Sequence, residues 1–250
     1  MRPFTALIAL ALAVALTFLT LPIVAIFVHT GPGALLSSLG DSASLDALRL
    51  SLETSTIALA IVIVVGTPAA YLLATRRFPG RALLITLVEL PLVLPPAVAG
   101  IGLLAALGPQ GFFDAGLVLQ TSGVVAALTF VSAPFFVRQA QAAFEAVDPV
   151  LIEASRTLGV GPARTFARVA VPVARQGLAA GAALAWGRAL GEFGATLMFA
   201  GSFRGVTQTA PLAIYERFST DFTGALALGA VLAAVSLAVL LSVKLVDAPR

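Results

Sequence analysis

The chain has 250 residues, of which 59% are apolar and only 11% are charged, whereas a soluble domain is about half apolar and about a quarter charged. It contains no cysteine and one histidine, which excludes disulfides, thiolate nucleophiles and the paired imidazoles of the common zinc hydrolases. The formal net charge of +3 could suggest a polyanionic partner, but charge in a membrane protein follows topology. We therefore expect an all-α integral membrane protein with no nucleic-acid partner.

Six apolar runs are each long enough to cross a bilayer, since a hydrocarbon layer of about 30 Å needs about 20 helical residues. They are Phe4 to Val28, Leu50 to Ala74, Ala82 to Leu107, Ser122 to Phe144, Gly177 to Ala200 and Phe222 to Val246. The first run follows Arg2, as a signal peptide would, but it exceeds the usual core of about 7 to 15 residues. We expect it to be retained, so the sequence predicts six transmembrane helices.

Prolines interrupt the second, third and fourth of these runs. They are Pro68 in the second run, Pro91, Pro95 and Pro96 in the third, and Pro134 in the fourth. A proline inside a span removes a backbone hydrogen bond and bends the helix, which is tolerated where neighbouring helices or a watered cavity satisfy the freed carbonyl. Proline is also simply commoner in membrane helices than in soluble ones, so both interpretations stay open.

Basic residues are concentrated in alternate loops. One set comprises Arg76, Arg77, Arg81, Arg156, Arg164, Arg168, Arg175, Lys244 and Arg250. The opposite loops hold Arg49, Arg204 and Arg217 beside Asp41, Asp46, Asp114, Glu216 and Asp221. The positive-inside rule therefore predicts that both termini lie in the cytoplasm.

The longest predicted cytoplasmic connection, residues 145–176, contains start and stop signals for two short helices. Asp148 can cap the first helix, and Pro149 can occupy its first position, where a missing N–H costs nothing. Gly159 can supply a left-handed stop. Pro162 then opens a second helix, which we expect to end near Pro172.

An apolar stripe follows one face of the first of these helices. Its members are Val150, Leu151, Ala154 and Leu158. A short amphipathic helix between two spans can lie on the membrane or dock into another protein. Because the stripe is narrow and the charges are mixed, we favour docking.

The same segment resembles the cytoplasmic EAA loop of ATP-binding-cassette importer permeases. That loop reads Glu-Ala-Ala, three residues, Gly, nine residues, Ile, one residue, Leu-Pro, and its matching positions are Glu153, Ala154, Ser155, Gly159, Val169, Val171 and Pro172. Serine replaces alanine at 155, and valine replaces isoleucine and leucine at 169 and 171. The departures conserve size or apolarity.

This resemblance implies a type I importer permease, with residues 1–44 as the first helix and an external loop and residues 45–250 as the permease core. It implies that the first helix of the loop is a coupling helix inserted into a cytoplasmic ATPase subunit. The residues expected at that contact are Asp148, Pro149, Glu153, Ala154, Ser155, Leu158, Gly159, Val169 and Pro172. The chain has no Gly-x-x-x-x-Gly-Lys-Ser/Thr loop. We therefore expect ATP and Mg²⁺ to bind the partner, and no catalytic or metal site here.

The fifth run carries small residues and one pair of opposite charges. Gly177 and Gly181 stand four residues apart, as do Gly187 and Gly191, so two backbones could approach closely on these faces. Arg188 and Glu192 also stand four apart, which allows an ion pair. An ionisable residue inside a span is a functional candidate, although this pair could equally serve only to neutralise itself. With Pro95 and Pro96, the residues Gly187, Arg188, Gly191 and Glu192 are our candidates for the pathway or for helix packing.

The string RALGEFGATLMFAG, followed by TQTAPLAIY, resembles the permeases for tetrahedral oxyanions, most closely the molybdate type. Tungstate and sulfate permeases are the alternatives, because sulfate permeases share the RALGEFG core. This resemblance implies a homodimer in the inner membrane that receives its anion from an extracytoplasmic binding protein. A secondary transporter is a rival interpretation, but we find no internal repeat and few intramembrane acids. An intramembrane enzyme would need a histidine dyad or a Gly-x-Ser-x-Gly elbow, and the sequence has neither.

Overall fold

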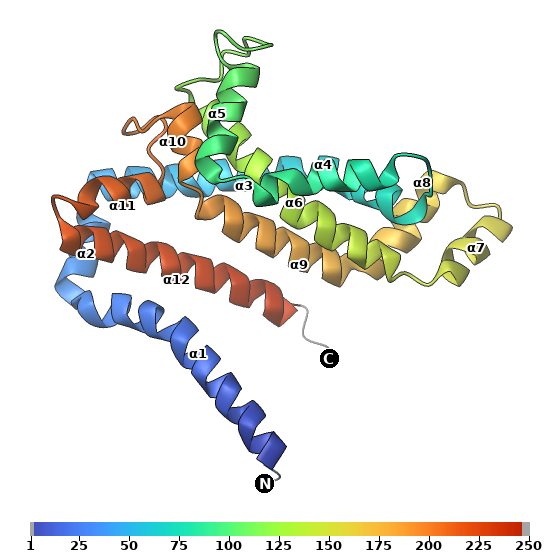
Figure 1. Ribbon diagram of the computed structural model, residues 1–250, viewed down its shortest axis with the longest axis horizontal. Coiled ribbons are helices and arrows are strands. Elements are labelled where there is room, and N and C mark those ends of the chain that lie inside the picture. The colour runs from blue at the N-terminus through green and yellow to red at the C-terminus, as the bar shows by residue number, and fades with distance from the viewer. Residues whose placement is uncertain (1–2, 247–250) are drawn as a thin grey trace.

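The computed structural model describes residues 3–246, and the regular elements of this part of the chain are all helices (Figure 1). In chain order the elements are α1 (Pro3–His29), α2 (Pro32–Gly40), α3 (Ser42–Thr75), α4 (Arg81–Val93), α5 (Pro96–Leu107), α6 (Thr121–Glu145), α7 (Pro149–Thr157), α8 (Pro162–Thr165), a π-helical turn η1 (Phe166–Ala170), α9 (Val171–Leu190), α10 (Gly194–Ala200), α11 (Ala210–Phe218) and α12 (Phe222–Val246). The predicted all-α class is thus confirmed for the described residues. Arg2, which entered the signal-peptide argument, and Arg250, which entered the topology argument, lie outside them.

Within the described residues, four helices are long and apolar enough to cross a membrane, namely α1, α3, α6 and α12. A fifth is reached if α4 and α5, which are bent by 117° at the break between them, form one broken span. The expected run from Ala82 to Leu107 is therefore not one straight helix. The expected run from Gly177 to Ala200 is likewise divided, into the end of α9 and the short α10.

Two consecutive prolines explain the first break. Pro95 cannot donate a backbone hydrogen bond, Leu94 before it adopts extended angles, and Pro96 then opens α5. By contrast, Pro68, Pro91 and Pro134 each lie inside one assigned helix. A single proline thus leaves the helix in place, whereas two in succession end it.

The core of the molecule is formed where α6 packs between α3 and α9. Its buried members are Val62, Ala70, Leu73, Phe136, Val137, Ala140, Phe144, Val147, Ala170, Ala174 and Ala185. Close approach depends on glycine, because a Cβ on Gly66 would lie 2.9 Å from the Phe136 ring and one on Gly177 would lie 2.4 Å from the Ala143 Cβ. The predicted packing role is confirmed for Gly177. At Gly187, by contrast, a Cβ would meet nothing within 4 Å.

The two broken runs meet each other. Helices α5 and α10 pack together beside the long axis of the bundle, as Figure 1 shows. A Cβ on Gly100 would lie 2.6 Å from the Ala195 carbonyl oxygen, and one on Gly194 would lie 3.0 Å from the Pro96 Cβ. The breaks at residues 94–95 and 191–193 therefore belong to one packed unit.

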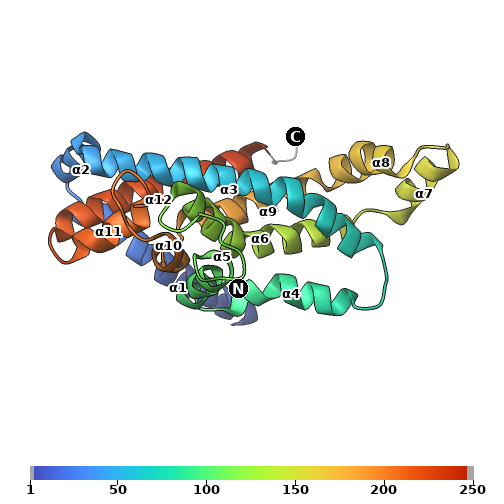
Figure 2. The same ribbon diagram turned by 90° about the horizontal axis from the view of Figure 1, so that it is seen from above.

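Helix α1 contacts α12, but its N-terminal part points away from the rest of the molecule (Figure 1), and none of the apolar stretch that qualifies it as a span is buried. Helix α2 occupies the segment expected as an external loop, and α3 already begins at Ser42. At the opposite extreme of the long axis, Figure 2 shows α7 and α8 projecting beyond the ends of α3 and α6.

Candidate functional site

The loop at the α7 end of the bundle begins as the sequence predicts. The Asp148 carboxylate accepts a hydrogen bond from the Val150 N–H at 2.9 Å, and Pro149 occupies the first position of α7. The helix stops at Gly159, which has a φ of +75°. Two backbone bonds close this end, from the Gly159 N–H to the Arg156 carbonyl at 2.9 Å and from the Val160 N–H to the Ser155 carbonyl at 3.1 Å. The predicted bounds of α7 are confirmed.

The second predicted helix starts at Pro162, but its expected end near Pro172 is wrong. Helix α8 runs through η1 directly into α9, and Pro172 lies in the first turn of α9. The π-helical turn before it, with the Val171 N–H bonded to the Phe166 carbonyl, shifts the bonding register where the proline lacks a donor. The loop is therefore joined to α9 by continuous helical backbone.

Ser155 was expected to face a partner, but its side chain points into the loop. It is 7% exposed, and its Oγ lies 2.9 Å from the Oγ1 of Thr165, which is 1% exposed. This bond fastens α7 to α8, so Ser155 positions the helix. Sequence analysis missed Thr165. The available signal was Ser155 itself, because a serine at a position where the loop pattern has alanine brings a hydroxyl group that needs a hydrogen-bond partner. Val169 is half-buried, and Pro172 is exposed.

The apolar stripe of α7 is uncovered. Val150 is 64% exposed, Leu151 43% and Leu158 82%. Ala154 and Glu153 are exposed as well. An apolar face that the chain itself leaves open, on a short capped helix, is available to a protein partner.

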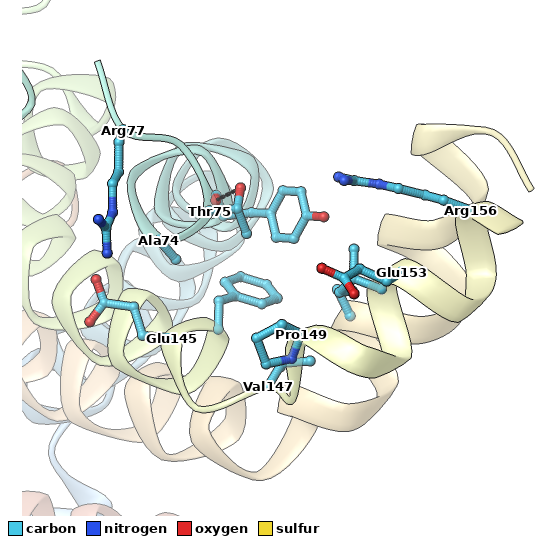
Figure 3. A pocket seen from close by; sticks show the side chains of 12 residues that line it. Ala74, Thr75, Arg77, Glu145, Val147, Pro149, Glu153 and Arg156 are labelled. Carbon is cyan, nitrogen blue, oxygen red and sulfur yellow. Dashed lines mark hydrogen bonds between the residues drawn. The ribbon is translucent and has the colours of Figure 1, made fainter. Parts of the chain in front are cut away.

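A cavity of about 390 Å³ lies between α7 and the ends of α3 and α6 (Figure 3). Its floor includes Tyr71 and Phe144, whose ring centroids are 5.2 Å apart. Its charged lining residues are Arg77, Glu145, Glu153 and Arg156. In Figure 3 the Glu153 carboxylate and the Arg156 guanidinium both point into this space. A docked partner could thus reach the ends of the membrane helices through the cavity.

Beside the cavity, α4 is fastened to α6 by two ion pairs. Arg81 lies 2.8 Å from Glu145, and Arg138 lies 2.7 Å from Glu89. Gln141 links them, because it accepts from Arg138 at 2.7 Å and donates to Glu145 at 2.9 Å. The sequence does not predict the pairing of Glu89 with Arg138, because the two residues belong to different helices.

The pathway candidates divide into two groups. Pro95 and Pro96 form the break between α4 and α5. Arg188 and Glu192 do form an ion pair, with Nη2 and Oε2 2.5 Å apart. Gly187 and Gly191 flank this pair without touching another helix.

At the other end of the bundle, α11 is tied to the start of α3. Arg217 pairs with Asp41 and also donates to the Ser44 Oγ at 2.8 Å. Hydrogen bonding from Arg217 lowers the pKa of Asp41 to about 2. Arg204 lies 3.6 Å from Asp46. Within the described residues, no three histidine, cysteine or acidic side chains are grouped so that they could hold a metal ion.

A helical membrane chain with a capped, exposed helix at one end has the architecture expected of a transporter subunit that docks onto a separate protein. The chain belongs to the family described as "Binding-protein-dependent transport system inner membrane component", which matches residues 63–249. It is therefore an inner-membrane permease subunit of an ATP-binding-cassette transporter, and is not itself an enzyme.

Three relatives illustrate the similarity. The chain is 38% identical over 237 residues to the molybdenum transport system permease protein ModB of Mycobacterium tuberculosis (91% of this chain, 89% of the relative). It is 36% identical over 245 residues to the sulfate transport system permease protein CysW of a Synechocystis species (92% and 89%). It is also 36% identical over 187 residues to the molybdate/tungstate transport system permease protein WtpB of Pyrococcus abyssi (74% and 73%).

The fold also resembles that of a solved transporter. A chain in a bacterial ABC transporter involved in alginate import superposes with a TM-score of 0.73 at 17% identity, covering 96% of this chain and 93% of the other. At this identity the likeness establishes the fold alone.

Proposed function

We propose that this chain forms the membrane pathway of an ATP-driven importer for tetrahedral oxyanions, with molybdate as the foremost cargo. Relatives named for molybdenum, molybdate or tungstate, and sulfate transport lie at 36 to 39% identity. Tungstate and sulfate are therefore the alternative cargoes. The three ions share a tetrahedral shape and a double negative charge, so one pathway chemistry suits them all.

The observation that carries the proposal is the exposed apolar face of α7, with Glu153 and the cavity behind it. We propose that α7 is the coupling helix and that it inserts into a cytoplasmic ATPase, which binds ATP and Mg²⁺. The cap at Asp148 and the stop at Gly159 keep the helix short and stiff. The continuous backbone from α8 through η1 to α9 carries its displacement to the membrane helices.

The proposed assembly is a homodimer in which each copy crosses the membrane six times, with both termini in the cytoplasm. This number follows if α4 with α5, and α9 with α10, each count as one broken pass beside α1, α3, α6 and α12. A loaded binding protein would dock at the opposite end, over residues 201–221. Closure of two ATPase subunits would then open the pathway outward.

The test is ATP-driven uptake of labelled molybdate into vesicles that contain this chain, its candidate ATPase and its binding protein. We expect Glu153→Arg to lower uptake at least about tenfold, because reversing a charge in a docked interface costs about 1.4 kcal/mol or more. Asp114→Arg is the matched control, since this exposed charge lies between α5 and α6, outside the loop. It should leave uptake unchanged.

Competition then ranks the cargo. An excess of unlabelled tungstate or sulfate that abolishes molybdate uptake at lower concentration than molybdate itself would reassign the substrate. Uptake that persists without ATP or without the two partners would contradict the importer and favour a secondary transporter.

A further inference from the structure

Among the described residues, four arginine–glutamate pairs lie on helices that cross or enter the membrane, and they differ in which partner is exposed. In the pair of Arg81 and Glu145, at the ends of α4 and α6, the side chains are 31% and 46% exposed. In the α3 pair, Arg49 and Glu53, the side chains are 79% and 53% exposed. In the α4–α6 pair, Arg138 and Glu89, both are 39% exposed. In the α9 pair, Arg188 is 27% exposed and Glu192 only 1%. Only in this last pair is the carboxylate buried while the guanidinium reaches the surface.

Glu192 is held from two directions at the break between α9 and α10. Its Oε1 accepts the Ala195 N–H at 2.7 Å, and its Oε2 lies 2.5 Å from the Arg188 Nη2. A carboxylate fixed in this way cannot swing out to cover the cation. The guanidinium is therefore the part of the pair that an approaching ion meets.

The backbone is open at the two glycines beside Arg188, and Gly191 also lines an apolar hollow with Phe193 and Tyr215. A Cβ on Gly187 would meet nothing within 4 Å, and one on Gly191 would meet only the Gly187 carbonyl, at 3.6 Å. These two glycines contrast with Gly177 and Gly181 on the same helix, which pack against α6. The chain thus leaves room beside the one cation that faces outward from this break.

We propose that Arg188 contacts the oxyanion cargo inside the translocation pathway and that Glu192 is its positioning residue. An ion with two negative charges needs a compensating cation wherever water is scarce, because Coulomb interactions strengthen as the dielectric constant falls. A guanidinium offers a planar fork of donors that matches a pair of oxyanion oxygens. Glu192 neutralises Arg188 when no cargo is present, which removes the cost of a lone charge in the membrane.

This inference rests on the proposed function, since it requires that the cargo cross as an anion. It differs from the role of the Arg138–Glu89 pair, whose equally exposed partners join α4 to α6. It also differs from helix packing, in which the face of Gly187 and Gly191 would be covered by a second copy of the chain.

The first test uses the absence of natural cysteine. Gly187→Cys is introduced into the full transporter in vesicles and labelled with two water-soluble methanethiosulfonates, one anionic and one cationic. We expect the anionic reagent to react about tenfold faster, relative to the cationic one, than it does with a free thiol, because the guanidinium is the exposed member of the pair and its carboxylate is buried behind it. The double variant Arg188→Gln, Glu192→Gln should abolish this preference.

Each other labelling outcome overturns the proposal. Reaction without charge preference means that Arg188 does not shape the field at this face. Protection from both reagents, with disulfide formation between copies, assigns the face to the dimer interface. Protection without cross-linking places it against lipid.

The second test is transport by the same vesicles. The double variant Arg188→Gln, Glu192→Gln should lower the maximal uptake rate at least tenfold, and Arg188→Lys with Glu192 intact should restore part of it. The matched control is Arg49→Gln, Glu53→Gln, which removes a pair of the same residues at the same spacing from α3. Uptake by the Arg188 variant at the level of this control contradicts the proposal. Failure of the unmodified chain to take up any oxyanion would contradict the proposed function instead.

Discussion

At the residue scale, two hydroxyl groups decide how α7 is held. Ser155 and Thr165 are both buried and bonded to each other across ten residues of sequence. A buried hydroxyl that loses its partner costs about 1 to 3 kcal/mol, whereas removing both partners can be nearly neutral. The pair is therefore best tested by a double-mutant cycle.

We expect Ser155→Ala alone to lower the free energy of unfolding of the detergent-solubilised protein by about 1 kcal/mol. Ser155→Ala combined with Thr165→Val should recover most of that loss. Thermal unfolding of the two single variants and the double variant measures the coupling. Strictly additive effects would mean that the two hydroxyls do not interact.

A second residue-scale prediction concerns Asp41, whose pKa is lowered to about 2, first by hydrogen bonding from Arg217. A lowered folded-state pKa means that the ionised carboxylate stabilises the fold above the ordinary pKa of about 4, and that this contribution is lost as the pH falls from 4 towards 2. The stability difference between the unmodified chain and Asp41→Asn should be constant from pH 7 to about 5. It should then vanish towards pH 2. A difference that stays constant to pH 2 would refute the ion pair.

At the element scale, the ends of α7 are determined by residues next to them in the sequence, whereas the way the helices are held together depends on contacts between distant residues. Asp148, Pro149 and Gly159 lie next to the helix ends that they define, so sequence alone predicts these ends correctly. The all-α class and the ion pair of Arg188 with Glu192 were predictable for the same reason, whereas the expected runs 82–107 and 177–200 are each divided into two helices. The inward turn of Ser155 depends on Thr165, and the fastening of α4 depends on Arg138 from α6. Such contacts are set by tertiary packing, which one sequence does not display.

The contact between α5 and α10 gives an element-scale prediction. We expect Gly100→Ala to destabilise the protein by about 1 to 3 kcal/mol, because the new methyl group would lie 2.6 Å from the Ala195 carbonyl oxygen. Gly102→Ala, two residues further along the same helix, meets nothing within 4 Å and serves as the control. Thermal unfolding in detergent compares the two. Equal stability of both variants would show that α5 and α10 do not pack closely.

At the scale of the whole molecule, the proposed topology places two exposed side chains on opposite sides of the membrane. Leu158 at the end of α7 is 82% exposed, and Phe112 in the connection between α5 and α6 is 86% exposed. With α7 in the cytoplasm, an impermeant thiol reagent added to intact cells should label Phe112→Cys and should spare Leu158→Cys until the membrane is opened. Labelling of both from outside, or the reverse pattern, contradicts the orientation.

The cavity behind α7 leaves the proposed coupling helix room to move. Helix α7 is joined to α6 by residues 146–148 and, across the turn at Gly159, to the continuous helical backbone of α8, η1 and α9, whereas about 390 Å³ of open space lies between it and the end of α3. A push on α7 therefore acts directly on α6 and α9 and reaches α3 only after this gap has closed. Small displacements of α7 are therefore taken up by the cavity, and only a large displacement moves α3 as well.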